Sequence, residues 1–154
     1  MELRRPLTQV FWTNVCDADV PFGGIIEHTN LVPAAHYGGR HVVYLSRYFT
    51  QGEAIAGADL QGIAESWMDL VRHQFAIPEA DVLSVQPFRT PYAAPLVSTG
   101  HLARIPSLSS SVRGLYVSTT AQIYPQDRGM SEGVRTGQAA ARRILSDLGV
   151  HQAV

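Results

Sequence analysis

The stretch Gly114-Leu-Tyr-Val-Ser-Thr-Thr-Ala-Gln-Ile-Tyr-Pro-Gln-Asp-Arg-Gly129 leads directly into a helical pattern from Met130 to Leu148. Its segment Leu115–Ile123 is apolar and rich in β-branched residues, which predicts a buried strand. Pro125 ends this strand, and residues 126–129 form a predicted tight turn. The helix that follows would present free backbone N–H groups, which suit an anion or an electron-rich carbonyl. An ordinary strand–turn–helix unit accounts for the same pattern.

The rest of the chain predicts a sheet with a helix across one face. Leu60–Phe75 carries apolar residues at helical spacing. His41–Tyr48 is the clearest predicted strand, with Val42, Tyr44 and Ser46 on one face and Val43, Leu45 and Arg47 on the other. We therefore expect an α+β fold: a mixed, mainly antiparallel sheet with one long helix across a face, plus a C-terminal strand–helix unit. The expected strands of the sheet are Val10–Val15, Gly24–Asn30, His41–Tyr48 and Val82–Arg89.

Several polar and aromatic residues are candidates for a site. His28, Thr29 and Asn30 end an otherwise apolar strand, where they either bind a ligand or satisfy backbone groups. The tyrosines at 44, 48, 92 and 124 either line a cavity or belong to the core. A metal site is not expected, because Glu27 points to the strand face opposite His28.

Composition excludes several function classes. The chain has 154 residues, a hydrophobic share of 45% and a net charge of −1, so nothing drives it toward nucleic acid or an anionic membrane. All 12 basic residues are arginines, which excludes lysine chemistry. Cys16 is the sole cysteine, so no internal disulfide can form. No segment reads as a membrane span or signal peptide, and we expect a cytoplasmic protein.

Gly114–Ala141 resembles the C-terminal flavin-closing segment of FAD-dependent oxidoreductases related to protoporphyrinogen oxidase and the flavin amine oxidases. Pro21–Asn30 and His41–Tyr48 extend the resemblance to nearly the whole chain, toward a bacterial branch described as NAD(P)- or FAD-dependent oxidoreductases. The resemblance implies a single domain in which residues 1–112 are substrate-domain-like and 113–148 form the flavin-closing strand and helix.

The resemblance also implies a cofactor and a set of site residues. FAD would accept a hydride from a C–N or C–C bond, with the helix N-terminus directed at the flavin N1–C2=O edge. The implied cofactor-binding residues are Asp127, Arg128, Gly129, Met130 and Ser131. The implied substrate-binding residues are His28, Asn30, Tyr44, Tyr92 and Tyr124. No residue identifies a catalytic acid or base, and the substrate cannot be read.

The dinucleotide fingerprint G-x-G-x-x-G is absent from the sequence, since Gly23-Gly24 and Gly38-Gly39 open no predicted helix. We therefore expect the C-terminal portion of a larger flavoprotein, which binds FAD weakly or not at all by itself. The alternative is a stand-alone α+β binding or interaction domain without a cofactor. In either case, we expect a homodimer or association with the missing dinucleotide-binding portion, because the C-terminal helix would otherwise expose its apolar face.

Overall fold

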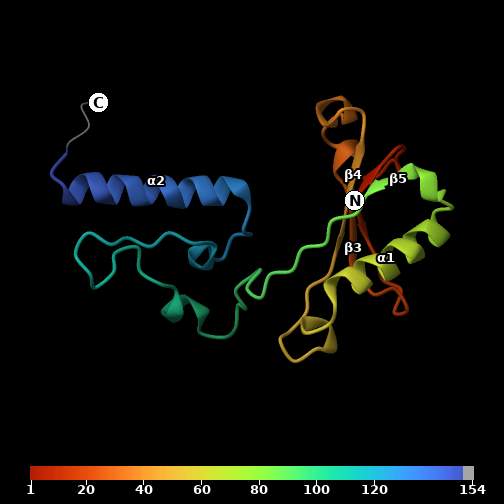
Figure 1. Ribbon diagram of the computed structural model, residues 1–154. Coiled ribbons are helices and arrows are strands. Elements are labelled where there is room, and N and C mark those ends of the chain that lie inside the picture. The colour runs from red at the N-terminus through yellow and green to blue at the C-terminus, as the bar shows by residue number, and fades with distance from the viewer. Residues whose placement is uncertain (151–154) are drawn as a thin grey trace. The chain divides into compact units, whose positions relative to one another are not determined.

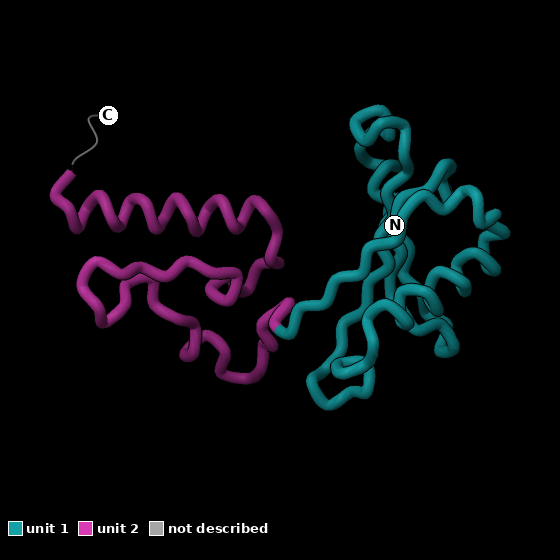
Figure 2. The backbone as a smooth tube through the Cα atoms, in the orientation of Figure 1, with its two compact units in different colours: residues 1–91 teal, residues 92–154 magenta. Residues whose placement is uncertain are grey.

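The computed structural model describes residues 1–150 and divides the chain into two compact units, Met1–Pro91 and Tyr92–Val154 (Figures 1 and 2). The boundary lies before residue 112, where the sequence analysis separated a substrate-domain-like part from the C-terminal strand and helix. The first unit holds the sheet and one α-helix. The second unit holds the other α-helix and an irregular chain beside it (Figure 2).

The first unit is built on a five-stranded sheet in the order β2-β3-β4-β1-β5. The strands are β1 (Glu2–Leu3), β2 (Trp12–Asn14), β3 (Gly24–Glu27), β4 (His41–Ser46) and β5 (Val82–Ser84). All four strand pairings are antiparallel. Together with the two helices, this sheet confirms the α+β class.

Each of the four predicted strands is present but shorter than expected. Gly24–Asn30 ends as a strand at Glu27, and His28–Asn30 is a 3-10 turn, η1. Thr29 explains part of this change, because its Oγ1 accepts a hydrogen bond from the Val42 backbone N–H at 3.2 Å. A hydroxyl that satisfies the neighbouring strand competes with the regular ladder. The prediction missed β1, whose two residues are too few for a period to show.

Helix α1 (Leu60–Gln74) covers one face of the sheet and confirms the predicted helix (Figure 1). It begins at Asp59, whose carboxylate accepts a hydrogen bond from the Gly62 N–H at 2.6 Å and so caps the first turn. Its buried residues pack against the sheet, and Trp67 also meets Phe22 with ring centroids 5.4 Å apart. The core consists of Leu3, Phe22, Ile25, Val43, Met68, Val71 and Ile77.

The predicted strand Leu115–Ile123 is wrong. Within the described part of this segment, only Tyr116 makes a bridge, with Ser109, and Thr120–Gln122 form a 3-10 turn, η6. Thr119 and Gln122 build a capping box around that turn, with the Gln122 side chain accepting from the Thr119 N–H at 2.8 Å. The polar residues thus bond locally instead of extending the apolar run into a ladder.

Helix α2 (Met130–Asp147) agrees with the predicted helix from Met130 to Leu148. It has no buried residue, and Ile123 is the only buried apolar residue of the described part of the second unit. Val134 and Leu148 are 60% and 71% exposed. Neither helix within residues 1–150 is long and apolar enough to cross a membrane.

Candidate functional site

The first cluster of candidate residues lies where β3 ends. Glu27, the last residue of β3, is 1% exposed and holds the loop that precedes β2. Its carboxylate accepts hydrogen bonds from the backbone N–H groups of Leu7 and Thr8 at 2.7 and 2.9 Å, and from Thr8 Oγ1 at 2.9 Å. These bonds fix the position at which η1 leaves the sheet.

His28 and Tyr44, both predicted to contact substrate, lie next to each other. Their rings meet edge to face with centroids 6.2 Å apart. Tyr37 joins them, because its hydroxyl lies 2.6 Å from His28 Nε2 and its ring 5.3 Å from the imidazole. Tyr44 is 51% exposed, so this aromatic cluster (His28, Tyr37 and Tyr44) is open to a ligand. It suits a flat or apolar group.

Tyr37 is a member of this cluster that was not among the predicted site residues. This residue lies at the end of the 3-10 turn η2 (Ala34–Tyr37), in a segment that reads only as a Gly- and Pro-rich loop. No periodic pattern links it to His28, and the contact depends on how η1 and η2 fold against β4. No sequence signal identifies it.

Asn30 has a structural role in this region. Its amide Nδ2 donates to the backbone carbonyls of Thr8 and Val10 at 3.1 and 3.0 Å. The amide therefore ties η1 to the loop before β2, beside the Glu27 contacts. The sequence left two roles for this strand end, ligand binding or bonding to backbone groups. In the structure, the Asn30 side chain bonds to backbone groups.

Tyr92 and Tyr124 belong to the second unit. Tyr92 is 90% exposed. Tyr124 lies against His101, with ring centroids 5.3 Å apart, and precedes Pro125 through a cis peptide bond. The five predicted substrate-binding residues are thus divided between the two units, and within the first unit only His28 and Tyr44 touch.

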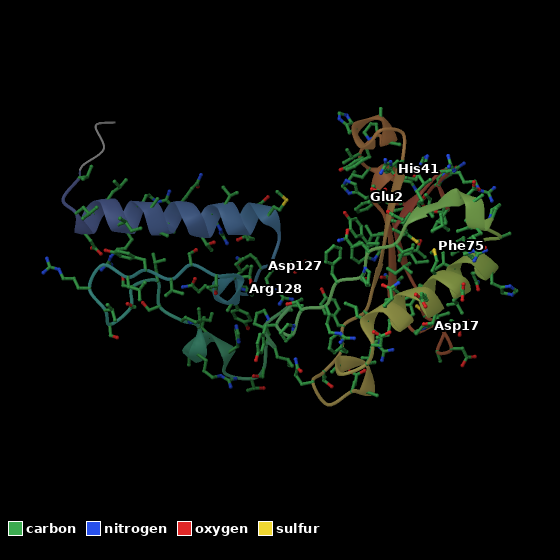
Figure 3. The ribbon with its side chains drawn as sticks, in the orientation of Figure 1. Glu2, Asp17, His41, Phe75, Asp127 and Arg128 are labelled. Atoms are coloured by element: carbon green, nitrogen blue, oxygen red, sulfur yellow. The ribbon has the colours of Figure 1, made fainter. Side chains whose placement is uncertain are left out.

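The five predicted cofactor-binding residues all lie at the start of α2 (Figure 3). Asp127 forms the turn, because its Oδ1 accepts from the Arg128 N–H at 2.8 Å and its backbone carbonyl accepts from the Gly129 N–H at 3.0 Å. Arg128 reaches the carbonyl of Pro95 at 3.4 Å. Both side chains thus hold the backbone that leads into the helix.

The first turn of α2 is open. Gly129 is the N-cap and provides no side-chain cap, and the first helical bond runs from Gly133 to the Gly129 carbonyl at 3.1 Å. The N–H groups of Met130, Ser131 and Glu132 have no acceptor among the described residues. Free N–H donors at the positive end of a helix dipole are groups that can donate to an electron-rich oxygen.

The described residues contain no group of three or more His, Cys, Asp or Glu that could hold a metal ion. No protein-family model, curated protein or solved structure matches this sequence.

Proposed function

We propose that this chain is part of an FAD-dependent oxidoreductase of the protoporphyrinogen oxidase and flavin amine oxidase type, with the substrate-facing sheet in its first unit and a flavin-contacting helix in its second. The observation that carries the proposal is the uncapped N-terminus of α2, preceded by the Asp127–Gly129 turn. The turn and the helix lie in the segment whose sequence resembles the flavin-closing segment of that family.

The residues at the start of α2 fit one edge of a flavin. A Cβ added at Gly129 would meet no atom within 4 Å, so the backbone there is open to a planar group. The amides of Met130 and Ser131 would donate to the N1–C2=O edge, and the helix dipole would stabilise negative charge there. When bound, the flavin supplies hydride acceptance, and the protein supplies binding and orientation.

The aromatic cluster of the first unit supports a role in substrate contact. Tyr44 and Tyr37 offer apolar ring faces, while the His28–Tyr37 hydrogen bond fixes the imidazole between them. Rings held in this way bind a flat substrate with little loss of side-chain entropy. No catalytic acid or base is assigned, because the substrate, and with it the proton to be moved, is not identified.

Amide NMR tests the flavin contact. Lumiflavin, which lacks the pyrophosphate and the ribose, should shift the amide signals of Met130, Ser131 and Glu132. Gly129→Asp should abolish these shifts, because an aspartate at the N-cap accepts from the same N–H groups. The control is Gly137→Asp, which adds the same charge about two turns further along α2 and should leave the shifts intact.

The same titration distinguishes the cofactor from a weak surface contact. FAD should bind the isolated chain more weakly than micromolar, because the chain contains no G-x-G-x-x-G loop for the pyrophosphate. If lumiflavin leaves the α2 amides unchanged, or shifts them equally in Gly129→Asp, the flavin role is wrong. Tight FAD binding in equilibrium dialysis would show that the chain holds more of the site than we propose.

A non-catalytic interaction domain is the second candidate, and one observation favours it. Helix α2 has no buried residue, although Val134, Ile144, Leu145 and Leu148 lie along one apolar stripe. A helix of this kind gains most of its stability by packing against a partner. Both candidates therefore expect the stripe to be covered in an assembly, and only the flavin titration separates them.

A further inference from the structure

The first unit contains a cavity of about 540 Å³. Its lining comes mainly from strand β4, helix α1 and residues 84–89, which begin at the end of β5 (Figure 1). Small-molecule sites have volumes of roughly 300–1,000 Å³ and mostly apolar walls. The cavity belongs wholly to the first unit, and Tyr44 is the only residue that it shares with the aromatic cluster.

The apolar part of the lining follows from the periodicity of α1. Residues three and four positions apart share one face of a helix, and one such face of α1 lines the cavity. The lining residues of this helix are Leu60, Ile63, Ala64, Trp67 and Met68. Leu45 of β4 and Phe49, which follows that strand, add two more apolar side chains. A ligand in this cavity therefore meets hydrocarbon from both the helix and the sheet.

Two side-chain hydrogen bonds hold the segment that follows β5. Arg89 Nη2 donates to the Ala58 carbonyl at 2.7 Å, just ahead of α1, and Gln51 Nε2 donates to the Pro91 carbonyl at 3.1 Å. Residues 85–89 form no strand, so these bonds rather than a sheet ladder hold them in place. The half-buried Arg89 side chain thereby becomes part of the lining near the N-terminal end of α1.

Two of the charged side chains that line the cavity are paired within the protein. The Glu2 carboxylate pairs with Arg40 at 2.8 Å, and the Arg47 guanidinium pairs with Glu53 at 2.9 Å. The amino group of Met1, also in the lining, donates to a backbone carbonyl of β4 at 2.8 Å. Since Glu2 is the only carboxylate in the lining, the cavity offers no free negative charge to a cation.

Arg89 is the charged side chain of the lining that has no acidic partner. No ion pair among residues 1–150 includes it, and its one protein acceptor within that range is the neutral carbonyl of Ala58. Asp59 is the next residue along the chain, but its carboxylate caps α1 and accepts from the Gly62 N–H at 2.6 Å. The Nε and Nη1 groups of Arg89 are therefore available as donors.

The chemistry of the lining specifies the ligand. A guanidinium forms its strongest hydrogen bonds with an anionic acceptor such as a carboxylate, and partial removal from water strengthens the attraction. One guanidinium without an acidic partner matches one carboxylate, while the apolar face of α1 matches a hydrocarbon body. An apolar monocarboxylate satisfies both parts of the cavity at once.

We propose that this cavity binds a small molecule with one carboxylate and an apolar body. The carboxylate accepts hydrogen bonds from Arg89, and the apolar body lies against Ile63, Ala64 and Trp67 of α1. The inference concerns the first unit alone, and it stands whether or not the flavin proposal is correct.

Tryptophan fluorescence tests the site on the full chain. In a Trp12→Phe parent, Trp67 is the only tryptophan, and it lines the cavity. Octanoate should shift its emission to shorter wavelength, because hydrocarbon replaces water beside the indole. Octanamide has nearly the same shape without the charge and should bind about tenfold more weakly, the loss expected for one charge-assisted hydrogen bond. Equal affinities of the two ligands would overturn the proposal.

The ratio of the two affinities isolates the role of Arg89. In Arg89→Gln the ratio should fall from about tenfold to about one, while octanamide still binds as it does to the parent. Arg4→Gln is the matched control, because Arg4 also donates to a backbone carbonyl, that of Ala80 at 2.9 Å, and lies outside the lining. It removes the same charge and should keep the ratio, and Arg89→Lys should restore part of it. A ratio that Arg89→Gln leaves unchanged, or that both glutamine variants lower equally, would show that the carboxylate does not bind at Arg89.

Two further measurements do not depend on the folding of the Arg89 variants. Ala64→Met fills part of the cavity and should abolish the emission shift with both ligands, whereas Gln61→Met, at an exposed position of α1, should preserve it. In the parent, the NMR signal of the Arg89 Nε–H should move with octanoate and not with octanamide. If Ala64→Met binds both ligands as the parent does, or if octanoate leaves the Arg89 signal unchanged, the ligand lies elsewhere and the proposal is wrong.

Discussion

The buried carboxylate of Glu27 offers the sharpest test of how the first unit is held together. It is 1% exposed and accepts three hydrogen bonds from the segment Leu7–Thr8, all between 2.7 and 2.9 Å. Glu27→Gln keeps the shape of the side chain but replaces one acceptor oxygen by an NH₂ donor. That donor would face groups that are themselves donors, so at least one of the three bonds is lost.

The expected cost follows from those contacts. A hydrogen bond to a charged group contributes about 1.5–3 kcal/mol, and a buried donor left without an acceptor costs about 1–3 kcal/mol. Because the amide oxygen still accepts from one N–H and the loop can relax, we expect Glu27→Gln to lower the free energy of unfolding by about 2–4 kcal/mol. A loss of that size is a large part of the stability of a small domain.

Urea unfolding followed by tryptophan fluorescence measures this cost in the first unit alone, because Trp12 and Trp67 both belong to it. The control is Glu65→Gln on the exposed face of α1, where the carboxylate accepts only from Gln61 at 3.0 Å, and its effect should stay below about 0.5 kcal/mol. A Glu27→Gln protein as stable as the control variant would refute the reasoning.

Two further predictions concern the second unit. Hydrogen bonds from Tyr116 at 2.6 Å and Arg143 at 3.0 Å lower the pKa of the Asp147 carboxyl, so their stabilisation is present above the ordinary pKa of about 3.9 and is lost as the pH falls through the lower folded value. The NMR signals of the Tyr116 ring should therefore change with pH at a midpoint below about 3.9, the ordinary pKa of an Asp carboxyl. Asp147→Asn should remove this change. A midpoint at or above the ordinary pKa would contradict the contact between Tyr116 and Asp147. Light scattering at micromolar concentration should report a dimer or larger species, because Val134 and Leu148 leave the α2 stripe exposed. Val134→Glu should shift the protein toward monomer, and a wild-type monomer would show that the stripe needs no partner.

The sequence predicted best those elements whose pattern is long and regular. Helix α1 is predicted within one residue of its end, because its apolar positions recur at helical spacing. The Asp59 cap was found only in the structure. Strand β4 is predicted from its run of β-branched and aromatic residues, and the buried Val43 and the half-exposed Tyr44 lie on opposite faces. Such periodic patterns arise because one face of the helix or strand is buried against the rest of the fold.

The failures have a local cause in each case. Leu115–Ile123 has the composition of a strand, but Thr119 and Gln122 cap a turn inside it. β1 is too short for any period. The contact of Tyr37 with His28 joins two 3-10 turns that no pattern of residues marks. Local side-chain hydrogen bonds, to the backbone at Thr119 and Gln122 and between side chains at Tyr37 and His28, set these segments against or beyond the residue pattern.

The two units leave three surfaces incomplete, and these surfaces differ in what can complete them. In the first unit, β4 continues past Val43 to Ser46 with no strand paired to it on the β1 side among the described residues. The second has a helix with an exposed apolar stripe and an uncapped N-terminus. An unpaired strand edge can pair with another extended chain, and an apolar stripe can pack against an apolar surface. Free amides can donate to an electron-rich atom. Both candidate functions expect the stripe to be covered, so the free amides at the start of α2 are the feature by which the flavin titration separates them.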